Sequence, residues 1–185
     1  MDLLEKATYF FPFSLHYSSM ISLYYLMEVI SMKNTISIEK AIALAFAYPE
    51  KNICYTYSCI CLFAMKNETV YIPVYGSNAS TWELSLKEDA QDFLLTDNDG
   101  TIWFPVFTNP SKFKKTDNSI QLLPAGLRTI LLYVCSLNHA NGLVFNPYSL
   151  RLLLPKKMIK ILLQAILQTK YDLLDTLDNS SSSPS

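Results

Sequence analysis

Residues 70–108 read VYIPVYGSNASTWELSLKEDAQDFLLTDNDGTIWFPVFT. Apolar side chains alternate with other side chains in several parts of this stretch, which is the period of a strand with one buried face. The pattern predicts strands at 70–75, 82–86, 93–96 and 101–108. Asp97-Asn98-Asp99-Gly100 predicts a hairpin turn between the last two strands, because Asn, Asp and Gly tolerate positive φ.

Helical spacing lies on both sides of this stretch. Ser37 can cap a helix whose apolar residues share one face, and Pro49 can open a second helix that ends near Met65. After residue 108 we expect a helix at 127–134 with Pro124 near its start, short strands at 143–145 and 150–154, and a last helix from Pro155. This order predicts the α+β class: an antiparallel or mixed sheet of about five strands, with helices packed on it, in a single domain.

A proline inside strand 70–75 limits how this strand can pair. Pro73 has no N–H to donate to a ladder, so we expect strand 70–75 to be an edge strand or to contain a bulge.

The domain boundaries follow from changes in composition. We expect an N-terminal extension at 1–33, the α+β domain at 34–170, and a helix end with a disordered Ser-rich tail at 171–185. The apolar stretch 9–30 leaves three alternatives open: an extension upstream of a native start at Met32 rather than Met1, an extra packed helix, or a membrane or targeting segment. Pro12 and His16 interrupt it, which weighs against a membrane span.

Charge and cysteine content narrow the function classes. The formal net charge is −1 and only two arginines occur, so the chain lacks the basic surface that nucleic-acid binding requires. Three of the four cysteines, Cys54, Cys59 and Cys61, are clustered, and Cys135 stands apart. This spacing is not a disulfide framework, and it favours reduced thiols in a cytoplasmic protein.

Residues with reactive side chains form no recognisable motif. His16 and His139 are the only imidazoles, and none of the four glycines belongs to a phosphate-binding loop. The spacing Cys54-x4-Cys59-x-Cys61 is not that of a zinc site. We therefore predict no catalytic residue, no metal site and no cofactor.

Aromatic residues are abundant, with 12 Tyr, 10 Phe and 2 Trp. We expect Tyr71, Tyr75, Trp103 and Tyr148 at outward positions. Exposed Tyr and Trp side chains suit the binding of a protein partner, because they bring a large apolar area together with a polar group.

Two segments carry a family resemblance. Trp103-Phe104-Pro105-Val106-Phe107-Thr108 resembles the Pro-x-Phe-Thr-Ser strand end of the SseB (enhanced serine sensitivity) family, with Asn109 in place of the serine. Gly142-Leu143-Val144-Phe145-Asn146-Pro147 is similar to the family's segment of a glycine, an apolar run and Asn-Pro, although Tyr148 stands where glycine is common. The resemblance covers about residues 34–168.

The resemblance implies a bacterial cytoplasmic α+β domain without an established catalytic activity. Larger members of the family carry a second, C-terminal domain, and we expect this chain to be without it. Both motifs end strands, so we expect them to lie side by side at one sheet end, where the candidate binding residues are Pro105, Phe107, Thr108, Asn146 and Pro147. A purely structural use of the same residues stays open, because proline ends pairing and Asn-Pro forms a rigid turn.

Two functions follow from these observations. The first is a non-catalytic protein-interaction or accessory module of the SseB-like type. The alternative is a small-ligand-binding or enzymatic domain with a site near Thr108 and Asn146.

Overall fold

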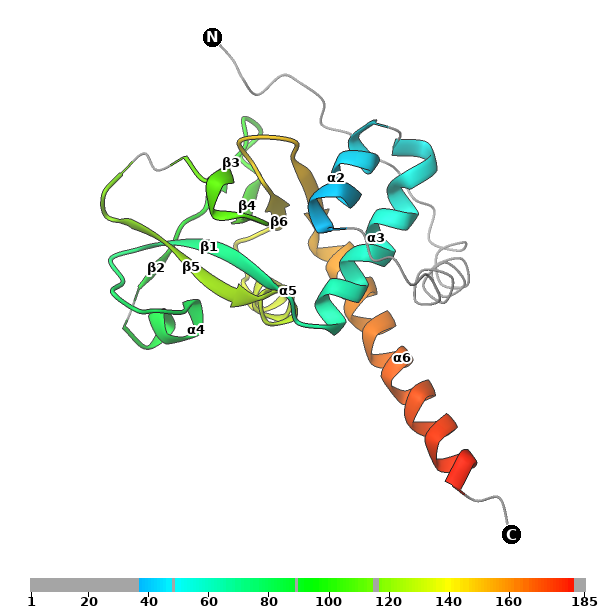
Figure 1. Ribbon diagram of the computed structural model, residues 1–185. Helices are drawn as coiled ribbons and strands as arrows, with labels where there is room; N and C mark the ends of the chain where they lie inside the picture. The colour runs from blue at the N-terminus through cyan, green and yellow to red at the C-terminus, as the bar shows by residue number, and fades with distance from the viewer. Residues whose placement is uncertain (1–36, 48, 89, 115–116, 182–185) are drawn as a thin grey trace.

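The fold of the protein is α+β, as predicted (Figure 1). The computed structural model describes residues 37–47, 49–88, 90–114 and 117–181. In chain order the elements are α2 (Ile38–Ala47), α3 (Pro49–Met65), β1 (Thr69–Tyr75), α4 (Trp82–Ser85), the 3₁₀ turn η1 (Leu86–Glu88), β2 (Gln91–Asp92), β3 (Leu95–Thr96), β4 (Ile102–Val106), the 3₁₀ turn η2 (Pro110–Lys112), β5 (Ile120–Gly126), α5 (Leu127–Ser136), β6 (Gly142–Phe145), β7 (Leu152–Pro155) and α6 (Lys156–Ser181).

The strands form two sheets rather than the single sheet of about five strands that we expected. One sheet is antiparallel with the order β2-β1-β5, and the other has the order β3-β4-β6-β7, in which β4 and β6 run parallel. A single bridge joins the sheets: Tyr71 N–H donates to the Phe107 carbonyl at 2.8 Å, and Phe107 N–H donates to the Tyr71 carbonyl at 2.9 Å.

Pro73 explains why this pairing stops after one bridge. Backbone groups two residues apart on a strand point to the same side, so the nitrogen of Pro73 lies on the side where Tyr71 meets Phe107, and it has no N–H to donate. We expected an edge strand or a bulge here, and neither is found: β1 is the central strand of its sheet, and its register with β5 is uninterrupted. Pro73 is accommodated in the gap between Phe107 and β2, which pairs only with Val74 and Tyr75.

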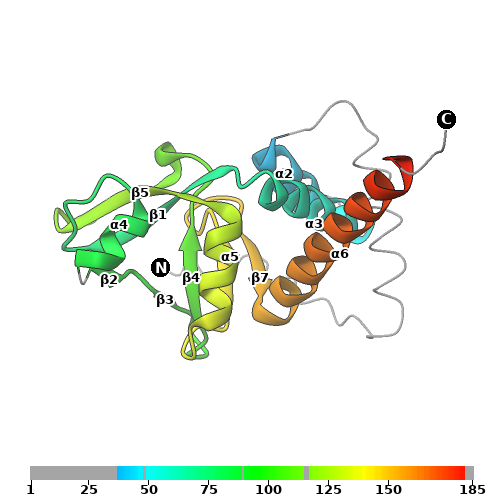
Figure 2. The same cartoon turned by 90° about the horizontal axis from the view of Figure 1, so that it is seen from below.

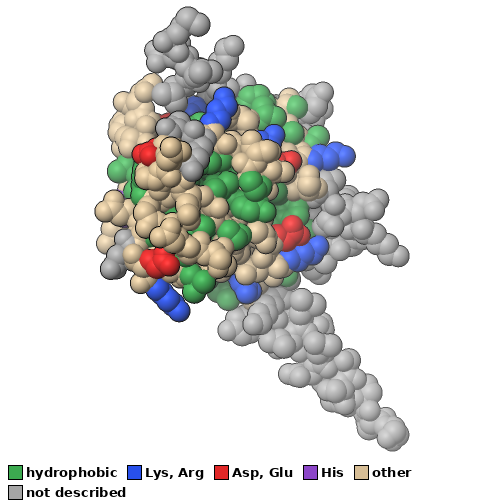
Figure 3. Space-filling view, turned by 60° about the vertical axis from the view of Figure 1, so that its left-hand side comes forward, with side chains coloured by type: hydrophobic (Ala, Val, Ile, Leu, Met, Phe, Trp, Pro, Cys, Tyr) green, Lys and Arg blue, Asp and Glu red, His purple; other side chains and the backbone are tan. Residues whose placement is uncertain are grey.

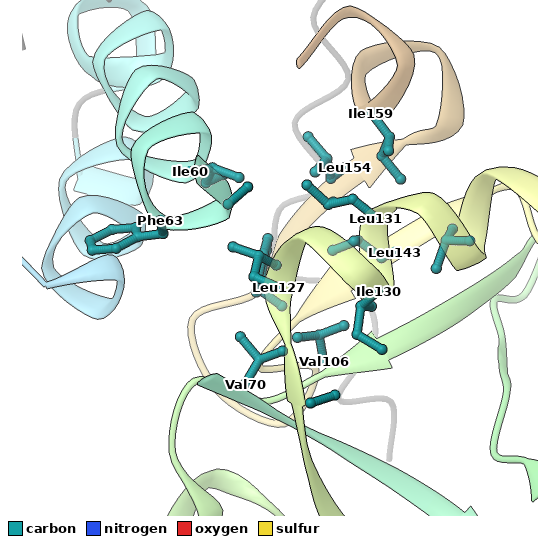
Figure 4. Close-up of a cluster of buried hydrophobic side chains, with 14 of the residues drawn as sticks. Ile60, Phe63, Val70, Val106, Leu127, Ile130, Leu131, Leu143, Leu154 and Ile159 are labelled. Carbon is teal, nitrogen blue, oxygen red and sulfur yellow. The ribbon is translucent and has the colours of Figure 1, made fainter. Parts of the chain in front are cut away.

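One hydrophobic core lies between the two sheets and the helices. Val70 of β1, Val106 of β4 and Leu143 of β6 meet α5 there, as Figure 4 shows. Ile60 of α3 and Ile159 of α6 belong to the same cluster. Both sheets therefore share one interior, as a single domain requires.

The segment 82–86 is helical, so the strand predicted there is wrong. Thr81 caps α4 by accepting a hydrogen bond from Leu84 N–H at 3.4 Å, and the Ser85 hydroxyl donates to the Trp82 carbonyl. Trp82 and Ser85 are buried while Leu84 is exposed, which is the three-residue spacing of a helix.

Residues 120–126 form a strand, β5, that the sequence analysis missed. It runs along the whole of β1. Pro124, which we had placed near the start of a helix, lies inside this strand. Pro124 is opposite Tyr71, whose backbone N–H and carbonyl both bond to Phe107. The Tyr71 carbonyl therefore needs no hydrogen bond from β5, and the missing N–H of Pro124 leaves no acceptor on Tyr71 unpaired.

The long helix α6 begins in the core, and its C-terminal part extends away from the two sheets and the other helices (Figures 1 and 2). It includes residues 171–181 of the stretch 171–185, for which we expected a helix end and a disordered Ser-rich tail. Residues 182–185 lie outside the described residues. The extension 1–33 and its apolar stretch 9–30 also lie outside them. In the part of the chain that is described, no helix combines the length and apolar character needed to cross a membrane.

Candidate functional site

The two strand-end motifs lie side by side. β4 and β6 are parallel neighbours, with Val106 opposite Phe145, so both strands end at the same edge of their sheet. Asn146 N–H donates to the Val106 carbonyl at 2.8 Å and continues the pairing by one residue. The fold therefore brings Phe107 and Thr108 next to Asn146 and Pro147.

The amide of Asn146 holds Thr108. Its Oδ1 accepts a hydrogen bond from Thr108 N–H at 3.0 Å, and its Nδ2 donates to Thr108 Oγ1 at 3.0 Å. Asn146 is buried and has a φ of 48°, a left-handed conformation that Asn adopts more readily than most side chains. Its carbonyl accepts from Ser149 N–H at 3.0 Å, which closes the turn after β6.

Glu39 completes this polar cluster, and the sequence analysis did not find it. It lies in the first turn of α2, and its Oε1 accepts from Thr108 Oγ1 at 3.0 Å. No local pattern in the sequence shows that α2 begins beside the end of β4, so nothing there indicates this contact. Hydrogen bonds join the side chains of Glu39, Thr108 and Asn146. They connect the start of α2 to the edge of the four-stranded sheet.

The other three predicted site residues, Pro105, Phe107 and Pro147, lie mostly beneath the surface rather than on it. Pro105 and Phe107 are buried, and Pro147 is half-buried. The Phe107 ring lies 5.3 Å from the Phe113 ring and 5.9 Å from the Tyr148 ring, measured between centroids. Phe107 of the first motif thus supports the rings of Phe113 and Tyr148, which are more exposed than Phe107 itself.

More apolar side chains lie on the outer face of the three-stranded sheet, which is the face turned away from the core. In an antiparallel pair, directly opposite residues share a face, and the register places Tyr71 opposite Pro124, Pro73 opposite Leu122 and Tyr75 opposite Ile120. Phe107, bridged to Tyr71, shares this face. We call its accessible part the aromatic surface, and it consists of Tyr71, Tyr75, Phe113, Leu122, Pro124 and Tyr148.

Ring contacts link members of the aromatic surface to buried aromatic side chains. Tyr75 packs against Phe93 with ring centroids 5.5 Å apart, and Phe93 and Ile120 are buried beneath it. Partial burial, and the nearby Tyr75, raise the pKa of the Tyr148 phenol. Tyr148 itself is 36% exposed. In Figure 3, which brings the left-hand side of Figure 1 forward, hydrophobic side chains gather in the middle of the view, while charged side chains lie mostly around its edge.

Trp103 is not part of this surface, so the prediction that it points outward is wrong. It is buried, and its Nε1 donates to Asp97 Oδ2 at 2.9 Å. Asp97 also lies 3.9 Å from Nη1 of Arg151. The indole therefore anchors the β3–β4 hairpin.

A second polar cluster lies on the inner side of β2. The Tyr133 hydroxyl of α5 donates to Asp92 Oδ2 at 2.5 Å. Burial raises the pKa of Asp92, while the hydrogen bond from Tyr133 and the nearby His139 lower it. Trp82 packs edge-on against Tyr133, with centroids 4.7 Å apart. This cluster joins α5 to β2, and the sequence analysis missed it because its members are far apart in the chain.

The thiols have the character of core residues. Cys59 and Cys61 are buried, and burial raises the pKa of both, that of Cys61 to about 12. Such thiols are protonated at neutral pH and are poor nucleophiles. Among the described residues no group of three or more His, Cys, Asp or Glu side chains is arranged to hold a metal ion.

Comparison with known proteins finds no matching family model, no matching curated protein and no matching solved structure.

Proposed function

We propose that the chain is a non-catalytic protein-interaction or accessory module of the SseB-like type, and that it binds a protein partner through the aromatic surface. The observation that carries this proposal is the grouping of Tyr71, Tyr75 and Tyr148, partly exposed, over a buried aromatic floor. Tyrosine side chains in such a position offer a large apolar area and a hydroxyl, and they lose little conformational entropy on binding.

The residues beneath the aromatic surface hold it in place, as a binding surface requires. Phe107 is held by its bridge to Tyr71, and Tyr148 follows the turn that Asn146 closes. A binding surface that is ordered before the partner arrives loses less entropy on association. The proposal includes a bacterial cytoplasmic protein whose partner is not a nucleic acid, in agreement with the resemblance and with the low charge.

The alternative, a small-ligand or enzymatic site near Thr108 and Asn146, has weaker support. Both amide atoms of Asn146 already bond to Thr108, and the Thr108 hydroxyl already bonds to Glu39. A ligand would have to break these hydrogen bonds before it could form its own.

The test uses the full chain as bait in an extract of its native host, followed by affinity measurement with the purified partner. We expect the double variant Tyr75→Ser/Tyr148→Ser to bind that partner about 100-fold more weakly, since a buried aromatic anchor contributes roughly 2 kcal/mol or more. Leu132→Ser is the matched control, because Leu132 is 55% exposed on α5, away from the outer face. Equal affinity of the double variant and the unaltered chain would refute the proposal.

A further inference from the structure

The chain enters the described structure beside the aromatic surface. Ser37 directly precedes α2, and Glu39 in the first turn of α2 bonds to Thr108 at 3.0 Å. Thr108 follows Phe107, whose ring contacts Phe113 and Tyr148. Whatever precedes Ser37 is therefore tethered next to this surface.

The tether is long enough for the preceding segment to reach all of the surface. Six residues lie between residue 30 and Ser37, and the seven Cα-to-Cα steps that join them span roughly 23 Å in an extended chain. The outer face of β1 is about 23 Å long, because β1 has seven residues at about 3.3 Å each. A segment that ends at residue 30 can therefore reach both ends of the aromatic surface.

The composition of this segment matches the surface. Residues 9–30 read YFFPFSLHYSSMISLYYLMEVI, with seven aromatic residues, no Lys or Arg, and Glu28 as the only acid. Leaving so many large apolar side chains in water is unfavourable by about 25 cal/mol for each Å² of apolar surface. Aromatic side chains also gain from offset and edge-on contacts with one another, which Tyr75, Phe113 and Tyr148 can supply.

We propose that residues 9–30 pack against the aromatic surface of their own chain and cover it until a protein partner displaces them. This inference deepens the proposed function and rests on it, because both concern the same surface. The tether favours the chain's own segment over a second copy, since a short linker gives an effective concentration on the order of millimolar.

The test places a photo-crosslinking residue at the centre of the surface in the full chain. Tyr148→p-benzoylphenylalanine is irradiated in dilute solution, and the linked peptides are identified by mass spectrometry. We expect one product within a single chain, joined to a residue between 9 and 30. The same probe at Leu132 is the control, and there we expect no link to that segment.

A variant of the segment provides a second measurement. Phe10→Ser/Phe11→Ser/Phe13→Ser in the probe-carrying chain should lower the yield of the link by about tenfold or more, since each removes a large apolar contact. Unchanged far-UV circular dichroism confirms that the variant still folds. Links between two copies, links only to other segments, no link at all, or an unchanged yield in the variant would each overturn the inference.

The two proposals fail in different ways. If residues 9–30 do not cover the surface, the crosslink is missing, but Tyr75→Ser/Tyr148→Ser still weakens the partner. If the surface binds no partner, the affinity is unchanged in that double variant, but the crosslink within one chain still forms.

Discussion

At the scale of single residues, Asn146 shows how one side chain meets two requirements. The turn after β6 needs a residue with φ of 48°, and the end of β4 needs a partner for the Thr108 N–H. Asn is the side chain that combines tolerance of left-handed backbone with an amide that both accepts and donates. The Asn-Pro segment noted in the sequence thus has a local physical reason.

Asn146→Ala removes the amide and keeps a Cβ in a left-handed conformation. We expect it to lower the free energy of unfolding by about 2–4 kcal/mol, from backbone strain and from the unpaired Thr108 N–H. Asn146→Gly relieves the strain and loses only the hydrogen bonds, so its loss should be smaller by about 1 kcal/mol. Urea unfolding of both variants measures the difference, and equal losses would contradict this account of the turn.

Asp92 makes stability depend on pH. Because burial raises its pKa above the ordinary 3.8, the ionised carboxylate is disfavoured in the folded state. The contribution of Asp92 to stability is full below pH 3.8 and is lost as the pH rises through the raised pKa. Asp92→Asn keeps an oxygen for the Tyr133 hydroxyl but does not titrate.

We therefore expect the stability of Asp92→Asn, relative to the unaltered chain, to increase as the pH rises from about 3 to 7. Urea unfolding midpoints at a series of pH values provide the measurement. Asp99→Asn is the control, because the pKa of the exposed Asp99 is lowered, which gives the opposite trend. Parallel profiles for Asp92→Asn and the unaltered chain would show that the buried carboxylate has no net effect.

At the scale of elements, apolar spacing predicted α2 and α5 because each of these helices presents one face to the single core. It also predicted α3, although residues 59–64 of that helix are all buried rather than confined to one face. It failed at α4, where five residues fit both alternation and a helical turn, and only the Thr81 cap distinguishes the two. At the candidate site, the two strand-end motifs were predictable. Glu39 and Phe113 were not, because they arrive through tertiary packing of distant elements, which leaves no local signal.

The pairing of β6 with β7 depends on a glycine. A Cβ on Gly142 would lie 2.8 Å from the Pro155 Cα and would also collide with the Leu154 carbonyl, both of which belong to the backbone of β7. We expect Gly142→Ala to cost about 2–3 kcal/mol, because the strands must separate.

Gly126→Ala is the comparison in urea unfolding. The three atoms nearest to a Cβ there all belong to the side chain of Asn67, which can rotate away at the expense of its hydrogen bond to Arg128 N–H. Its loss should be about 1 kcal/mol. A smaller effect for Gly142→Ala than for Gly126→Ala would contradict the strand contact.

At the scale of the whole molecule, two sheets joined by one bridge still unfold together if their shared core governs stability. The tryptophans test this, because Trp82 of α4 packs beside the three-stranded sheet and Trp103 belongs to the four-stranded sheet. In Trp82→Phe and in Trp103→Phe, the remaining tryptophan reports on one sheet. We expect its fluorescence transition in urea to coincide with the far-UV circular dichroism of the same variant. Separate midpoints within one variant would mean that the sheets unfold independently.

The direction of α6 has a practical consequence for measuring such interactions. The helix has 26 residues, or roughly 39 Å, and in Figure 1 it runs to the side of the molecule away from β1 and β5. A biotin or dye attached at this end sits at the tip of a natural spacer. A chip that captures the protein there would hold β1 and β5 on the far side of the molecule from the attachment point.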